Sequence, residues 1–233
     1  MDYILYLIAG AFAGFLSGLF GLGGGIIIVP ALIFLFTSNG LPPEVLTHLA
    51  IGTSLATIVV TSISSTMTHH QKGSVRWDLL RWLVPGILLG SIVGGIFAIS
   101  LSGPILQLLF GFLMIVVAAQ LLVSPGPSAG SMPSKPYLSC AGFFIGTLST
   151  LFGIGGGTLT TPLLTAFGTK IRQAVATSAA CGLPIALAGG ATYLIVGLNI
   201  DSLPAGSLGY IFIPAWLSIV LTSMPFARAG ALL

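Results

Sequence analysis

Charged side chains are scarce in this sequence of 233 residues. Asp, Glu, Lys and Arg together make up only 5% of the chain, whereas 55% of it is hydrophobic. A soluble domain carries about 25% charged residues, because its surface must be solvated. With a mean hydropathy of +1.12, most of the surface is expected to face lipid. The composition therefore excludes a soluble domain and predicts an all-α polytopic membrane protein embedded in a lipid bilayer.

Basic residues and cysteines are also few. The seven Lys and Arg residues give a net charge of only +3, and they are spread over several loops, so no nucleic-acid partner is expected. The two cysteines, Cys140 and Cys181, lie in separate apolar segments, which excludes a disulfide framework or a metal finger. Asp2 stands where a signal peptide carries bases, so the N-terminal segment is predicted to be the first membrane element.

Enzyme signatures are missing as well. The glycine-rich cluster that begins at Gly21 is followed by no Lys-Ser/Thr pair and lacks the third glycine of a dinucleotide fingerprint. No serine stands in a hydrolase-type motif with a base. We therefore predict a protein that is not an enzyme and that needs no cofactor and no resident metal.

The sequence contains an internal repeat. The segment FGLGGG, which starts at Phe20 and is followed by Pro30, recurs as FGIGGG, which starts at Phe152 and is followed by Pro162. Downstream, AIGTS is echoed by AVATS, and RWLVPGILLG is loosely echoed by GYIFIPAWLS. Three matches in the same order indicate a duplication. We predict a first transmembrane repeat over 1–123, a Pro/Ser/Gly-rich cytoplasmic linker over 124–136 and a second repeat over 137–233.

Each half is predicted to begin with an apolar element that is broken at its glycine cluster. The first half has this element at 3–37 and helices at about 44–67, 79–100 and 104–123; the second has it at 137–169 and helices at about 171–197 and 207–227. The repeat predicts a partner for the helix 104–123 after Leu233, so we expect either that the sequence is a fragment, which we favour, or that the final span has been lost. Gly10, Gly14, Gly18, Gly86, Gly90 and Gly94 have the spacing of helix-packing glycines.

The placement of charge predicts the topology. About 12 residues follow each glycine cluster, roughly 18 Å of helix, which is too short for a hydrocarbon core of about 30 Å. Each broken element is therefore expected to be re-entrant. All seven bases then fall on one side, with Asp78, and the positive-inside rule puts that side in the cytoplasm and the N-terminus outside. Three crossings per half make the second repeat inverted, an arrangement typical of secondary transporters in the cell inner membrane.

A substrate site is predicted where the broken elements meet. The spans hold no charged residue at mid-depth, so an anion would be met by backbone N–H groups at the breaks and by nearby hydroxyls. The hydroxyls could instead bond to a helix carbonyl one turn back. The predicted substrate-binding residues are Gly23, Gly24, Gly25, Thr53, Ser54, Gly155, Gly156, Gly157, Thr177 and Ser178.

Three histidines allow other roles. His69 and His70, at the inner end of one helix, could couple transport to protons, because the pKa of histidine is close to physiological pH. As neighbours they point about 100° apart on a helix, which makes a shared metal awkward. Metal uptake through these two residues and His48 is a weaker alternative, and plain interfacial polar residues are the simplest interpretation.

The segments GLFGLGGGIIIVPAL, TLFGIGGGTLTTPLL, AIGTS and AVATS resemble the sulfite exporter TauE/SafE family of membrane permeases over essentially the whole chain. The resemblance implies transport of a small sulfur-containing anion such as sulfite, thiosulfate or an organosulfonate, and an eighth helix.

We therefore expect an alternating-access secondary transporter for such an anion. An anion channel and a non-transporting membrane partner or assembly protein remain as alternatives. The sequence does not give the substrate, the direction or the coupling ion, and it leaves a homo-oligomer open.

Overall fold

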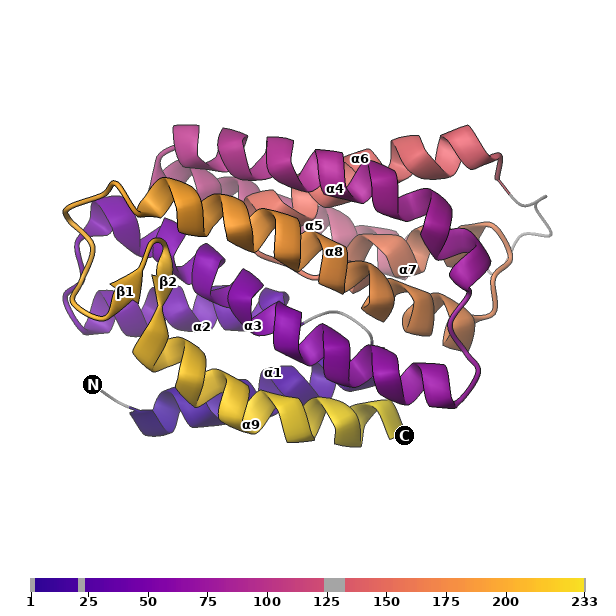
Figure 1. Cartoon of the computed structure of the whole chain (residues 1–233), viewed down its shortest axis with the longest axis horizontal. Helices are drawn as coiled ribbons and strands as arrows, with labels where there is room; N and C mark the ends of the chain where they lie inside the picture. Colours follow the sequence, from indigo (N-terminus) through magenta and orange to yellow (C-terminus); the bar gives the residue numbers. More distant parts are fainter. Residues whose placement is uncertain (1–2, 21–23, 124–132, 233) are drawn as a thin grey trace.

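The computed structural model describes residues 3–20, 24–123 and 133–232, and these are almost entirely helical (Figure 1). The helices are α1 (Tyr3–Phe20), α2 (Gly25–Ser38), α3 (Pro43–Gln71), α4 (Trp77–Ser100), α5 (Gly103–Val123), α6 (Lys135–Phe152), α7 (Gly157–Ala166), α8 (Ile171–Gly197) and α9 (Ile213–Leu232). Six of them, α1, α3, α4, α5, α8 and α9, are long and apolar enough to cross a membrane. The prediction of an all-helical polytopic membrane protein is thus confirmed.

The helices form three layers. The long helices α3 and α8 pack against each other across the middle of the molecule, α1 pairs with α9 on one side, and α4 pairs with α6 on the other (Figure 1). Each outer pair joins one helix from the first half of the sequence to one from the second. The two halves are therefore intertwined.

The outer pairs are close because glycines face the backbone of the partner helix. A Cβ atom on Gly10, Gly14 or Gly18 of α1 would overlap backbone atoms of α9, and one on Gly86, Gly90 or Gly94 of α4 would overlap backbone atoms of α6. Small residues are what lets two helices approach in a membrane, where burial of apolar surface drives no association. The packing role predicted for these six glycines is confirmed.

Two short helices return to the end of the molecule from which they came. In Figure 1, α1 enters from the end at which the N-terminus lies, and α2 runs back to that end, where α3 begins. α6 enters from the opposite end, and α7 returns there to join α8.

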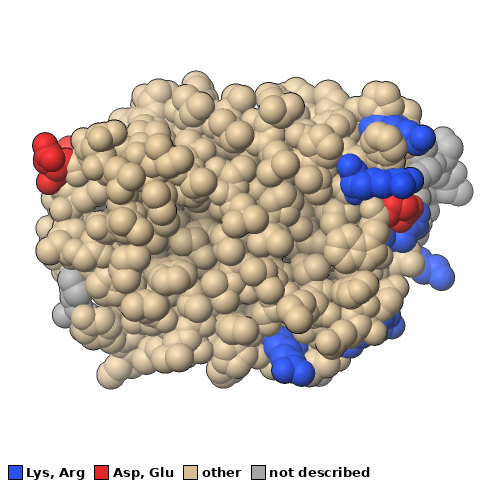
Figure 2. Space-filling model, in the orientation of Figure 1, with Lys and Arg blue, Asp and Glu red and all other residues tan. Residues whose placement is uncertain are grey.

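The charged residues of the described chain collect at the two ends of the bundle (Figure 2). Glu44 in the first turn of α3 and Asp201 after α8 lie at the acidic end. The basic end carries Asp78 and the bases, which lie at or near the helix ends on that side, namely Lys72, Arg76, Arg81, Lys135, Lys170, Arg172 and Arg228. Asp2 lies outside the described residues. Between the two ends the surface is apolar, as lipid contact requires.

The prediction of a helix over 207–227 is wrong at its start. Residues Ser207–Leu208 (β1) and Ile211–Phe212 (β2) form a small antiparallel hairpin, and α9 begins only at Ile213. Gly206 and Gly209 have φ angles of +90° and +54°, which a right-handed helix cannot contain. The predicted linker 124–136 falls largely on 124–132, outside the described residues, and its last two residues, Lys135 and Pro136, belong to α6.

Candidate functional site at the glycine breaks

The two glycine breaks touch each other at the centre of the molecule. Gly25, the first residue of α2, lies so close to the second break that a Cβ atom on it would overlap the carbonyl oxygen of Gly153 and come within 2.7 Å of the Cα of Ile154. Gly24 and Gly153 have φ angles of +75° and +66°, which glycine adopts without strain. The backbones of the two breaks are thus in direct contact, although they lie far apart in the sequence.

A helix begins at each of the two breaks. α2 begins at Gly25 and α7 begins at Gly157, and the first N–H groups of a helix have no partner within it. They carry a partial positive charge that favours anions. Gly155, Gly156 and Gly157 are buried at the second break, whereas the predicted residue Gly23 lies outside the described residues.

The two predicted serines lie against the second break. Ser54 of α3 donates a hydrogen bond to the carbonyl oxygen of Gly153, at 2.8 Å. Ser178 of α8 donates to the carbonyl oxygen of Ala174, at 2.6 Å, and its hydroxyl also pairs with that of Thr161 on α7. A Cβ on Gly156 would lie only 3.0 Å from the carbonyl oxygen of Ser178. The serines therefore hold the break between α3 and α8.

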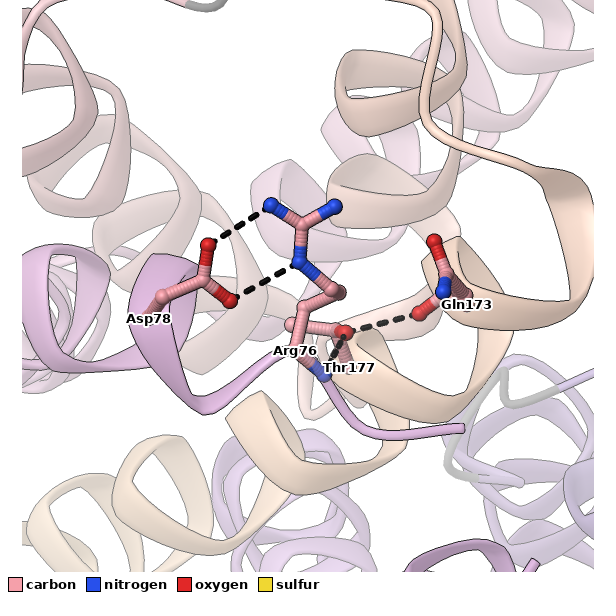
Figure 3. Close-up of polar contacts among 4 residues, drawn as sticks. All are labelled: Arg76, Asp78, Gln173 and Thr177. Carbon is pink, nitrogen blue, oxygen red and sulfur yellow. Dashed lines mark hydrogen bonds and ion pairs between the residues drawn. The ribbon is translucent and has the colours of Figure 1, made fainter. Parts of the chain in front are cut away.

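Each of the two predicted threonines accepts a hydrogen bond from the residue just before another helix, and we call these two hydrogen bonds the threonine ties. Thr177 of α8 donates to the carbonyl oxygen of Gln173 at 2.7 Å and accepts a hydrogen bond from the backbone N–H of Arg76 at 3.0 Å (Figure 3). Thr53 of α3 donates to Leu49 at 2.6 Å and accepts from the backbone N–H of Phe212 at 2.9 Å. Arg76 directly precedes α4, and Phe212 directly precedes α9.

All four predicted hydroxyl residues are 0% exposed. The alternative interpretation, a bond to the helix carbonyl one turn back, describes Thr53, Thr177 and Ser178. In this arrangement these hydroxyls are occupied by the protein itself, so the backbone of the breaks is the part of the predicted site that can still accept a ligand.

Next to the Thr177 tie, Arg76 forms an ion pair with Asp78. Its Nε and Nη2 donate to the two carboxylate oxygens at 2.8 and 2.6 Å (Figure 3). The carboxylate raises the pKa of Arg76 above its usual value through these hydrogen bonds. The pair lies at the start of α4, at the basic end.

Two cavities lie beside residues discussed above. One, of about 420 Å³, lies between α2, α3 and α5, and its walls include Val29, Ile51 and Phe152. Val29 and Ile51 also contact Gly153, so this cavity reaches the second break. The other, of about 500 Å³, lies at the basic end beside His69, Lys72 and Arg172.

The histidines do not form a metal centre. His48 and His69 lie near opposite ends of the 29-residue helix α3, roughly 30 Å apart at 1.5 Å per residue. His69 is buried, whereas the exposed His70 accepts a hydrogen bond from the indole of Trp77 at 3.2 Å. The part of the chain that the structure describes holds no group of three His, Cys, Asp or Glu residues that could bind a metal ion.

Sequence reasoning missed a second set of polar residues near the second break. Ser149, Thr150 and Thr158 are at most 3% exposed, and their hydroxyls have no hydrogen-bond partner among the described residues. Buried hydroxyls are nearly always paired with protein or water. Their position directly beside FGIGGG was a usable signal, because the first copy has mostly aliphatic residues around its break.

Comparison with known proteins agrees with this architecture. Residues 6–233 match the family model for the sulfite exporter TauE/SafE. A "Probable membrane transporter protein" of Haemophilus influenzae is 39% identical over 98% of this chain and 87% of its own length. "Probable membrane transporter protein YunE" of Bacillus subtilis is 31% identical over 84% of this chain and 80% of its own length.

A third relative, a probable membrane transporter protein of Methanocaldococcus jannaschii, is 32% identical over 92% of this chain and 78% of its own length. No solved structure matches the chain. Since the family model covers nearly the whole chain, this multi-pass membrane protein, a transporter and not an enzyme, belongs to the sulfite exporter TauE/SafE family.

Proposed function

We propose that this protein is a secondary transporter that moves a small sulfur-containing oxyanion, such as sulfite, thiosulfate or an organosulfonate, by alternating access. The observation that carries the proposal is the contact between the two glycine breaks, where Gly25 lies against the backbone of Gly153. Irregular backbone at membrane depth is tolerated only where it is buried in protein or lines a cavity. The family name points to a sulfite-type anion.

The chemistry at the breaks suits an anion. The helices α2 and α7 both begin there, and the Lys, Arg, Asp and Glu residues of the described chain lie at or near the ends of other helices or in the loops between them. Backbone dipoles at a helix start bind oxyanions without a fixed positive charge. An uncharged site also lets the anion leave again. The proposed contacts are the backbone N–H groups of Gly23–Gly25 and Gly155–Gly157, positioned by Thr53, Ser54, Thr177 and Ser178.

The helix contacts support an inverted repeat. Gly10 of α1 faces the backbone of Ile219 on α9, and Gly142 of α6 faces that of Leu83 on α4. One turn further along, Gly14 faces Ser223 and the corresponding Gly146 faces Ile87. The glycines of the partner helices give the same correspondence, since Gly230 of α9 faces Phe15 and Gly94 of α4 faces Thr147. These pairs align Leu83 with Ile219, a register different from the one that matches Pro85 with Pro214. If the repeat is inverted, α2 and α7 are re-entrant from opposite faces, and the bases lie in the cytoplasm.

Alternating access requires contacts between halves that can break at one face while they hold at the other. The Thr53–Phe212 and Thr177–Arg76 hydrogen bonds have this character, because each joins a central helix of one half to the start of a helix of the other half. We infer that the halves rock about the break contact and that these ties open alternately.

Counterflow in proteoliposomes tests the proposal. Vesicles with purified full-length chain and unlabelled sulfite inside should accumulate labelled sulfite transiently and with saturation. The Gly156→Val variant should lose this exchange, because its side chain would meet Cys181 and Ser178. Gly111→Ala should keep it, since no atom lies within 4 Å of the added Cβ.

Flux that rises linearly with concentration and shows no counterflow would identify a channel. Absence of flux and of binding for sulfite, thiosulfate and sulfoacetate would refute transport of this class of anion.

A further inference from the structure

A cluster of buried polar side chains lies between the second break and the hairpin at the acidic end. Its members are His48, Ser149, Thr150 and Tyr193, each at most 5% exposed. His48 Nδ1, Ser149 Oγ, Thr150 Oγ1 and Tyr193 Oη have no hydrogen-bond partner within the described chain. Four unpaired polar atoms in one buried region would be costly for a structure that never filled them with a ligand or water.

The contacts of these residues form a closed ring. Thr150 packs between Gly95 of α4 and Gly189 of α8. One turn further along α4, the carbonyl oxygen of Ala98 accepts a hydrogen bond from Nε2 of His48, at 3.2 Å. One turn further along α8, the ring of Tyr193 lies 6.2 Å from that of Tyr210, and Tyr210 lies 5.4 Å from the ring of His48. Since a helical turn is about 5.4 Å, the ring extends over about one turn of α4 and of α8.

The hydrogen bond to Ala98 decides the protonation pattern of His48. A carbonyl oxygen only accepts, so Nε2 must carry the hydrogen, and Nδ1 of the neutral ring is then a free base. The hydroxyls of Thr150 and Tyr193 in the ring can donate, and Ser149 directly precedes Thr150 on α6. The ring thus offers one base that can take up a proton and two uncharged donors, a combination that suits an oxyanion.

We propose that this cluster is a binding site for the transported oxyanion together with one proton, which His48 Nδ1 accepts from solvent. The imidazolium and the anion form a pair with less net charge than the anion alone, which reduces the cost of burial. Tyr210 covers the site, so the anion enters when the hairpin moves away from α3 and α8. The inference rests on the proposed function and assigns its coupling proton to His48 in place of His69 or His70.

Few other ionisable groups face His48. Tyr210 contacts it from the hairpin. From α4 it meets the backbone at Ala98 and Leu101, and from its own helix the backbone at Glu44. No described Lys or Arg lies at this end of the molecule, so protonation of His48 would supply the positive charge for the anion.

The test measures anion affinity and proton uptake on the purified full chain with sulfite and thiosulfate. Calorimetry in buffers of different ionisation enthalpy gives the protons taken up per anion, after correction for the titration of the anion itself. Wild type should take up close to one proton. His48→Gln keeps a donor for Ala98 but cannot bind a proton, so it should take up none and bind about tenfold more weakly. His69→Gln and His70→Gln should match wild type.

Tyr193→Phe and Thr150→Val test the donors. Each should raise the Kd about tenfold, and neither should lower the melting temperature of the ligand-free protein, because the hydroxyl removed has no partner. Thr147→Val is the matched control on α6, since its hydroxyl already donates to Phe143.

Proton uptake that survives in His48→Gln, or an unchanged Kd in both donor variants, would overturn the inference while the proposed function stands. Failure of wild type to bind either anion would overturn both.

Discussion

The two glycine breaks have the same glycine pattern in the sequence but differ in backbone and in side chains: Gly24, before α2, has a φ of +75°, whereas the corresponding Gly156, before α7, has a φ of −60°. After the first, the chain reads Gly25-Ile-Ile-Ile-Val-Pro30; after the second, it reads Gly157-Thr-Leu-Thr-Thr-Pro162. In the first, Ile28 and Val29 are buried and apolar. In the second, Thr160 is buried at the position that corresponds to Ile28, and Thr158 is buried two residues before it. The two breaks therefore differ in the polarity of the side chains that follow them.

This difference separates what the fold needs from what a ligand needs. A break that serves packing alone is satisfied by aliphatic residues, as the first one shows. Buried hydroxyls without partners, such as those of Ser149, Thr150 and Thr158, cost about 1–3 kcal/mol each. Their presence beside the second break indicates that the second half carries much of the polar recognition, while the aliphatic residues after the first break provide an apolar wall.

The largest expected effect comes from adding one methyl group at the contact between the breaks. Gly25→Ala would drive Cβ into the backbone of Gly153 and Ile154, which cannot move aside as a side chain can. We expect a loss of about 3 kcal/mol in the free energy of unfolding, measured by denaturation in detergent. Gly156→Ala meets Cβ of Cys181 at 2.9 Å and should cost about 1 kcal/mol.

Gly111→Ala is the control for this pair, since it adds the same methyl group in open space and should leave the free energy of unfolding unchanged or slightly raised. Equal losses in Gly25→Ala and Gly156→Ala would mean that the two breaks are packed alike.

Much of the fold could be predicted because the membrane imposes simple rules. Long apolar stretches, glycines spaced four apart and the segregation of charge gave the helices, their packing faces and the charged ends. The hairpin before α9 was missed, because Ser207–Phe212 is as apolar as a helix, and the left-handed conformation of Gly206 and Gly209 is visible only in the structure.

The candidate site was harder to predict, because a hydroxyl residue does not reveal its partner. Thr53 and Thr177 were chosen from the repeat, and the structure uses both to hold N–H groups of distant segments. The unpaired atoms of His48 and Tyr193 could not be found from sequence, because they depend on contacts among α3, α4, α8 and the hairpin.

A smaller effect is expected from the two threonine ties, and it should again differ between the halves. Thr53→Val removes the acceptor for the N–H of Phe212, a residue that is 0% exposed, so about 2 kcal/mol should be lost. Thr177→Val removes the acceptor for the N–H of Arg76, which is only half-buried. Water can replace that bond, so about 1 kcal/mol should be lost.

Unfolding in detergent measures both losses, and Thr37→Val, which removes an exposed hydroxyl that bonds only to its own helix, is the control. If Thr177→Val costs as much as Thr53→Val, solvent does not reach the tie at the basic end.

The smallest effect on stability is expected from breaking the Arg76–Asp78 ion pair, which lies beside the Thr177–Arg76 hydrogen bond. Asp78→Asn removes the charge that Arg76 contacts at 2.6 Å, in a pair whose side chains are 31% and 50% exposed. Pairs this exposed contribute about 0.2–1 kcal/mol and are screened by salt. The variant should therefore lower the melting temperature slightly in low salt and not at all in high salt.

The double variant of Asp78→Asn and Thr177→Val tests whether the ion pair supports the tie. If the pair and the hydroxyl both hold the start of α4, the double variant should lose more free energy of unfolding than the two single variants together, because in each single variant the remaining group still positions Arg76. A strictly additive double variant would show that the ion pair lies beside the tie without supporting it, and the difference between the two ends would then rest on solvent exposure alone.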